Sequence, residues 1–266
     1  MPRGFGPNVV IDGTSLQRPV KITRYESDVH TELLSVLAFD TGRAVINEIW
    51  SRPKRLRIRP WLRQSRNATA SPADDRAATA PFHPVRDAED GHHEAAWGHG
   101  TGRGSNVVIR YSPKTWGDDR LPAWDPTARN NWAAATGVMP PLPGEESGEV
   151  LLHEMVHALR QMSGRETGLP MRRGFDTQEE FFAVLITNVY TSERGPFRQL
   201  RGDHGTAPLL YPSSWRRDRE FQALIRAITV SHPSLVRRLA RVRAQFNPFA
   251  GVYDFDDPGF PARPAR

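Results

Sequence analysis

The chain has 266 residues, a formal net charge of +6 and no cysteine. A chain of this length can bury a sizeable core, and the lack of cysteine excludes disulfides and cysteine-ligated metal. Histidine, aspartate and glutamate are therefore the only candidate metal ligands. The positive charge comes almost wholly from arginines that are spread along the chain without a nucleic-acid-binding motif, so we do not expect nucleic acid as a partner.

The first residues, MPRGFGPNVVIDG, contain no apolar run of the kind found in a Sec signal peptide. No apolar run anywhere approaches the ~20 residues that span a bilayer. We therefore expect a soluble protein without a membrane span, and any export would use a route other than Sec.

The N-terminal part predicts two strands, a helical region and a third strand. Apolar runs at 9–11 and 20–23 are typical of short strands separated by a Gly-containing turn. Residues 29–50 are predicted to be helical, with an interruption at Gly42. Basic and apolar residues alternate over 54–60, which predicts a half-buried strand.

The composition changes between about 63 and 103, where alanine, proline, glycine and charge dominate without a clear period. Such a segment buries little apolar surface, so we predict a flexible insertion. It contains His92, His93 and His99. Clustered histidines can bind metal, but a flexible polar loop is the simpler interpretation.

The C-terminal half predicts one strand, a Trp- and Pro-rich connection and four helices. The strand covers 105–113, and the helical segments cover 147–164, 177–193, about 217–230 and 233–246. Ser147 is the expected N-cap of the first of these helices, and Gly164 is suited to the left-handed position after its end. We expect a single α+β domain over 1–266.

The first of these helices contains EVLLHEMVHALRQMSG at 149–164. Residues four apart lie on one face of a helix, so His153 and His157 can direct two imidazoles at one ion, with Glu154 beside them. In HExxH zinc sites the histidines bind the metal and the glutamate activates its water. The alternative is an ordinary amphipathic helix that happens to contain these residues.

A catalytic zinc needs a third protein ligand. Arg160 and Ser163 stand where the astacin-like pattern requires Gly and His, so that class is excluded. The next helix begins with Glu179 and Glu180, and either carboxylate could be the ligand. Thr177 and Glu180 also have the spacing of a capping box, but beside an HExxH helix we favour a ligand.

Three segments resemble one family of enzymes. HEMVHALR (153–160), EEFFAVLITNVYTSE (179–193) and LRGDH (200–204) are similar to the metallopeptidase effectors typified by the type III effector NleD and to related toxin domains. The likeness covers most of the chain except 63–99. EFFA also resembles the third-ligand helix of anthrax lethal factor, which implies Glu180 as the ligand, with Glu179 in the second shell or unused.

The resemblance implies a zincin fold of the gluzincin kind, in which a small twisted sheet packs on the HExxH helix and its edge strand presents the substrate backbone. Our candidate for a strand beside the cleft is 105–113. The implied activity is cleavage of a specific protein inside a target cell after type III or type VI secretion. An immunity protein or a secretion chaperone is a further candidate partner.

The implied centre holds Zn²⁺ between His153, His157 and Glu180, with Glu154 as the general base. The oxyanion needs a further donor, for which His204 is our first candidate and Tyr190 our second. The alternative for His204 is a loop-stabilising pair with Asp203. We expect Arg201 to brace the same loop, and Thr187 and Asn188 either to orient a ligand or to bond between helices.

Two other classes of function remain as alternatives. A zincin-fold module could bind its target without cutting it, or a basic protein could bind nucleic acid with HExxH present by chance. The intact Glu154 argues against the first, because a structural zinc site has no use for that carboxylate. The scattered arginines argue against the second.

Overall fold

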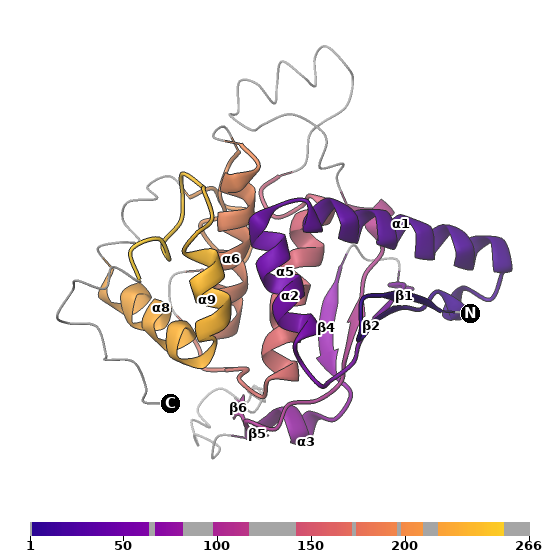
Figure 1. Ribbon diagram of the computed structural model, residues 1–266, viewed down its shortest axis with the longest axis horizontal. Coiled ribbons are helices and arrows are strands. Elements are labelled where there is room, and N and C mark those ends of the chain that lie inside the picture. The colour runs from indigo at the N-terminus through magenta and orange to yellow at the C-terminus, as the bar shows by residue number, and fades with distance from the viewer. Residues whose placement is uncertain are drawn as a thin grey trace, which may run out of the picture.

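Five strands form a small mixed sheet (Figure 1). The middle strands run parallel, and the two edge strands are antiparallel to their neighbours. In spatial order the strands are β1 (Arg3–Phe5), β2 (Val9–Ile11), β3 (Leu56–Arg59), β7 (Val107–Arg110) and β4 (Thr69–Pro72). The computed structural model describes residues 2–63, 67–81, 98–116, 142–171, 174–195, 198–209 and 218–252.

The predicted strands at 9–11, 54–60 and 105–113 are confirmed as β2, β3 and β7. β3 and β7 alternate buried and more exposed residues, as a strand with one covered face does. Leu56 lies opposite Val107, and Ile58 lies opposite Ile109. All four side chains are buried in the core.

The helices pack around one central helix. In Figure 1 the five-stranded sheet lies on one side of α5, and α6, α8 and α9 lie on the other. Every residue of α5 is buried, since it contacts α1, α2, α6, β4 and β7. The main helices are α1 (Pro19–Leu37), α2 (Asp40–Trp50), α5 (Ser147–Met162), α6 (Gln178–Glu193), α8 (Arg219–Ser231) and α9 (Pro233–Leu239).

The predicted α+β class is confirmed, with corrections at several boundaries. The predicted strand at 20–23 is wrong, because these residues form the first turns of α1, with Pro19 at its start. The predicted helix over 29–50 is two helices that meet at 38–39. Gly42 does not interrupt them: it lies within α2, where a Cβ would collide with the carbonyl oxygen of Val36. Glycine therefore permits α1 and α2 to meet closely.

The ends of three further helices can be compared with the prediction. α5 has Glu146 as its N-cap instead of Ser147, whose hydroxyl donates to Glu32, while Gly164 takes the expected left-handed conformation. Thr177 caps α6, as its spacing from Glu180 allowed, because its hydroxyl accepts from the N–H of Glu180. α9 ends at Leu239, well before 246, because the Asn247 side chain donates to the carbonyls of Leu239 and Val242 there.

The prediction of a flexible insertion over 63–103 is wrong for 67–81 and 98–103. These stretches form β4, the short helix α3 (Asp75–Ala78) and the hairpin of β5 (Thr79–Pro81) and β6 (Gly98–Gly100). Backbone pairing with β7 holds β4 in the sheet, and such pairing needs no apolar periodicity. His99 lies in β6, whereas His92 and His93 lie outside the described residues. None of the described helices combines the length and apolar character needed to cross a membrane.

Candidate metal centre

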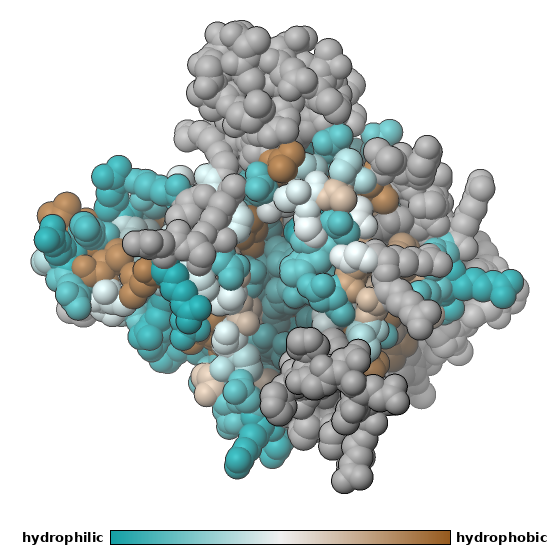
Figure 2. Space-filling model, turned by 180° about the vertical axis from the view of Figure 1, so that it is seen from behind, coloured by the Kyte–Doolittle hydropathy of each residue, from teal (hydrophilic) through white to brown (hydrophobic). Residues whose placement is uncertain are grey.

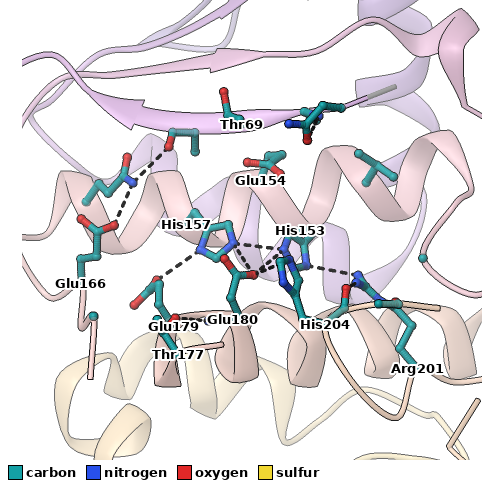
Figure 3. Close-up of a pocket in the computed structure, with 18 of the residues that line it drawn as sticks. Thr69, His153, Glu154, His157, Glu166, Thr177, Glu179, Glu180, Arg201 and His204 are labelled. Atoms are coloured by element: carbon teal, nitrogen blue, oxygen red, sulfur yellow. Dashed lines mark hydrogen bonds and ion pairs between the residues drawn. The ribbon is translucent and has the colours of Figure 1, made fainter. Parts of the chain in front are cut away.

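Three segments bring metal-binding side chains to one point (Figure 3). His153 and His157 lie one turn apart on α5, Glu180 lies in the first turn of α6, and His204 lies in the loop that follows Leu200. α5 and α6 pack against each other, so the two histidines and the glutamate are held by rigid elements. The predicted ligands His153, His157 and Glu180 are therefore brought together.

The donor atoms are spaced like the ligands of a single ion. Glu180 Oε2 lies 3.1 Å from His153 Nε2, 3.2 Å from His157 Nε2 and 3.1 Å from His204 Nε2. The two Nε2 atoms on α5 are 3.0 Å apart. A tetrahedral metal with bonds of about 2.0–2.1 Å places its donors about 3.3 Å apart. His153, Glu180 and His204 form a group that could hold a metal ion, and His157 adjoins it.

The two helix histidines differ in charge. Burial lowers the pKa of His153 to about 3, and the nearby Arg201 guanidinium acts in the same direction, so the neutral ring, the form that binds metals, is favoured. Burial also lowers the pKa of His157, but Glu180, Glu179 and Glu154 outweigh burial and raise this pKa well above its ordinary value. The carboxylates thus favour a positive charge at this place, which a metal cation supplies as well as a proton does.

The neighbouring carboxylates Glu179 and Glu180 have different partners. Both Glu179 oxygens accept from Arg160 Nε, at 2.8 and 2.7 Å, and Oε2 also accepts from the N–H of Thr167 at 3.1 Å. Glu179 Oε1 lies 3.5 Å from His157 Nδ1, the ring nitrogen that faces away from Glu180. Glu180 therefore belongs to the donor cluster, and Glu179 stands behind His157.

Glu154 lines the same cavity and is buried beside β4. Burial raises the pKa of its carboxyl to about 7, and the charge on His157 and the backbone N–H of Ala70 partly oppose this rise. A carboxyl with a pKa in this range can both accept and release a proton near neutral pH.

His204 faces the donor cluster from the loop. Its Nε2 contacts Glu180, and its Nδ1 pairs with Asp176 Oδ2 at 2.7 Å. Asp203, which the alternative interpretation paired with His204, instead accepts from the N–H of Ala207. The sequence did not indicate Asp176, because its approach to His204 depends on how two loops meet.

Arg201 braces the loop, as the sequence predicted. Its Nε donates to the carbonyl of Gly205 at 3.0 Å, and its Nη2 donates to the carbonyl of His204. The backbone N–H and carbonyl of Arg201 form hydrogen bonds with the Asn188 side chain. Asn188 therefore connects α6 to this loop. Nη1 of Arg201 lies 3.5 Å from His153 Nδ1. A guanidinium can only donate hydrogen bonds. If His153 binds a metal through Nε2, its own proton lies on Nδ1, so Arg201 Nη1 and His153 Nδ1 form no hydrogen bond in the metal-bound state.

Two other predicted residues lie away from the cluster. Tyr190 is fully buried against Phe39, with the Arg194 guanidinium near its ring, and does not line the cavity. Its position does not support a role in stabilising an oxyanion. The Thr187 hydroxyl donates to the carbonyl of Ala183 within α6 and orients no ligand.

The cluster opens into a cavity of about 810 Å³. One wall is the edge strand β4, and the others come from α5, the start of α6 and the loop of Arg201. On the face shown in Figure 2, hydrophilic residues surround a hollow near the middle of the molecule. The predicted strand beside the cleft, 105–113, forms β7, which is paired on both sides. The strand at the cavity is β4, which lies in the segment interpreted as an insertion.

Comparison of the chain with protein-family models, with curated proteins and with solved structures finds no match. The chemistry of the centre therefore has to be inferred from its own residues.

Proposed function

We propose that the protein is a zinc-dependent endopeptidase with a zincin-like fold. The observation that carries this proposal is the convergence of two histidines from one helix and Glu180 from the next, with Glu154 beside them at an open cavity. An ordinary amphipathic helix would not require a buried glutamate from a second helix to meet its histidines.

The donor set fits zinc. Imidazole nitrogens and a carboxylate oxygen, in a chain without cysteine, are typical ligands of catalytic Zn²⁺. Glu179 supports this choice, because an acceptor behind a ligating histidine fixes its tautomer and its orientation. The ligands would be His153, His157 and Glu180.

When bound, Zn²⁺ would supply a Lewis acid that polarises the scissile carbonyl and acidifies a water molecule. Glu154 lines the cavity beside the ligands, where it can take a proton from water and pass it to the leaving amine. β4 holds Glu154 through the N–H of Ala70. As an edge strand it also borders the space that an extended peptide would occupy.

The biological setting rests on the resemblance to the NleD-type effectors. On that basis the protein is delivered into a target cell by type III or type VI secretion and cleaves a specific protein there. An immunity protein or a secretion chaperone would then be its partner before delivery.

The direct test of catalysis compares wild type with Glu154→Gln. Both proteins would be loaded with zinc and incubated with bacterial and eukaryotic cell extracts, and newly formed protein N-termini would be identified by mass spectrometry. We expect equal zinc contents and new N-termini only with wild type. Equal cleavage by the two proteins, or no zinc in either, would contradict the proposal.

One observation favours a second function, a non-catalytic target-binding module with structural zinc. His204 brings a fourth donor to 3.1 Å from Glu180, and four protein ligands make a closed site. The variant His204→Ala separates the two functions. A zinc affinity close to that of wild type indicates an open fourth position and a role for His204 toward substrate, whereas a large loss of affinity indicates a closed structural site.

A further inference from the structure

Glu166, a half-buried carboxylate of the cavity, forms no ion pair within the described part of the chain. Glu166 accepts a single hydrogen bond, from Gln161 Nε2 at 3.1 Å. Two other carboxylates of the cavity have charged or polar partners: Glu180 lies among the histidines, and Glu179 is paired with Arg160. Glu154 also forms no ion pair among the described residues, but it accepts from the backbone N–H of Ala70 and stands beside the metal donors. Because Arg160 is paired with Glu179, Glu166 has no ion-pair partner of its own among the described residues.

Gln161, which is 3% exposed, adds a second acceptor at the same end. Its Nε2 is shared between the Ala70 carbonyl of β4 and Glu166. Its Oε1 is buried and has no hydrogen-bond partner among the described residues. Buried acceptors normally have a donor, but among the described residues Gln161 Oε1 has none and Glu166 has only Gln161 Nε2.

The surrounding charges do not remove this imbalance. Burial raises the pKa of Glu166, the neighbouring Glu179 raises it further, and Gln161, His157 and Arg160 only partly oppose the rise. The Arg160 guanidinium donates to Glu179 and to the carbonyl of Arg165, and it forms no ion pair with Glu166, although its Nη1 has no hydrogen-bond partner among the described residues. An incoming cation would therefore meet a carboxylate that is already partly withdrawn from water, where a charge-assisted hydrogen bond is strong.

We infer that Glu166 and Gln161 form a subsite for a cationic side chain of the substrate, arginine in preference to lysine. A guanidinium offers several N–H groups in a planar fork and can meet a carboxylate and an amide oxygen together, whereas an ammonium is a compact point charge. The inference rests on the proposed protease function and adds to it a class of substrate, a polypeptide with a basic residue close to the cleaved bond.

The position of Glu166 indicates at which end of a bound peptide the basic side chain would lie. Figure 3 shows Glu166 and Arg201 at opposite ends of the labelled residues, with the metal donors between them. A peptide that crosses the centre would therefore place a basic side chain at the Glu166 end. Gln161 also contacts β4, so the subsite adjoins the edge strand.

The test uses binding and does not require a known substrate. Short peptide hydroxamates, which hold the metal through the hydroxamate, would carry arginine at each position in turn on either side of that group. Each would be matched by a peptide with citrulline, which keeps the shape of arginine without its charge. Affinities for the zinc-loaded protein would be measured by calorimetry. At one position we expect the arginine peptide to bind roughly 10- to 100-fold more tightly than its partner.

Two variants locate the effect. Glu166→Gln should abolish the arginine preference and leave zinc content and citrulline-peptide binding unchanged. Glu145→Gln removes a carboxylate elsewhere on the cavity wall and should keep most of the preference. Lysine peptides should bind wild type less tightly than arginine peptides.

The outcomes separate the two proposals. Zinc-dependent binding of all hydroxamates without an arginine preference at any position would overturn the subsite and leave the metal centre standing. A preference that Glu145→Gln removes as completely as Glu166→Gln does would also overturn it, because general cavity charge would then be the cause. Failure of the protein to take up zinc or to bind any hydroxamate would remove the protease proposal, and the subsite with it.

Discussion

The two ends of the metal cavity use their charges differently. At one end, Arg201 donates to the carbonyls of Gly205 and His204, and its charge is enclosed by the loop that it braces. At the other end, Glu166 accepts a hydrogen bond from one amide and forms no ion pair in the described structure. A charge whose partners lie within the chain stabilises the fold, whereas a charge without such partners is available to a ligand. Stability measurements on matched variants test this distinction.

The largest effect is expected at Glu179, which lies at the same end of the cavity as Glu166 but has its charge enclosed by Arg160. Its partner Arg160 and Glu179 itself have side chains only 4% and 6% exposed, so Glu179→Gln leaves a buried guanidinium without its counter-charge. Breaking a buried pair from one side costs about 3–5 kcal/mol of unfolding free energy. Denaturant unfolding of the metal-free protein would measure the loss. A loss below about 1 kcal/mol would show that water or another carboxylate readily replaces Glu179.

A smaller loss is expected for Arg201→Met, which keeps much of the side-chain volume and removes the donors. The carbonyls of Gly205 and His204 then lose their hydrogen bonds, at a cost of about 1–3 kcal/mol. His204 should also lose its fixed position, so zinc affinity should be compared in the same samples. Unchanged stability together with unchanged zinc affinity would contradict the bracing role.

The smallest effect is expected at Glu166. Glu166→Gln should change the unfolding free energy at pH 7 by no more than about 0.5 kcal/mol, the usual range for a residue outside the core network, and should tend to stabilise the protein. A loss of several kcal/mol would show that Glu166 is a structural charge, and the contrast between the two ends would fail.

The pH dependence of the unfolding free energy gives a second test at Glu166. Burial raises the pKa of Glu166 above its ordinary value of 4.5. Between pH 4.5 and the raised pKa, the folded protein therefore binds more protons than the unfolded chain. Stability contributed by this group is therefore present below pH 4.5 and is lost as the pH rises through the folded-state pKa. The unfolding free energy of wild type relative to Glu166→Gln should fall over that interval. A constant difference would contradict the raised pKa.

The helices of the centre could be predicted because their signals are local. The spacing of His153 and His157 defines one helix face, and the Thr177 cap marks where α6 begins. The choice between Glu179 and Glu180 could not be made from spacing alone, because both lie in the first turn of α6. In the structure the two carboxylates differ in their partners, because Arg160 donates a hydrogen bond to Glu179.

The cavity wall could not be predicted, because it depends on contacts between distant segments. β4 contains Thr69, Ala70, Ser71 and Pro72, which have no apolar alternation, and its backbone pairing with β7 leaves no mark on the sequence. The partners of His204 and Glu166 are set in the same way: Asp176 is brought by a loop, and Gln161 is fixed between Glu166 and β4.

The most direct test of the metal centre is the zinc content of wild type and Glu180→Ala, purified side by side without metal-chelating resin and measured by elemental mass spectrometry. We expect about one zinc per wild-type chain and a sharply reduced content in the variant, because Glu180 is the carboxylate that meets both helix histidines. A wild-type protein that is metal-free and cannot be reloaded with zinc would contradict the account.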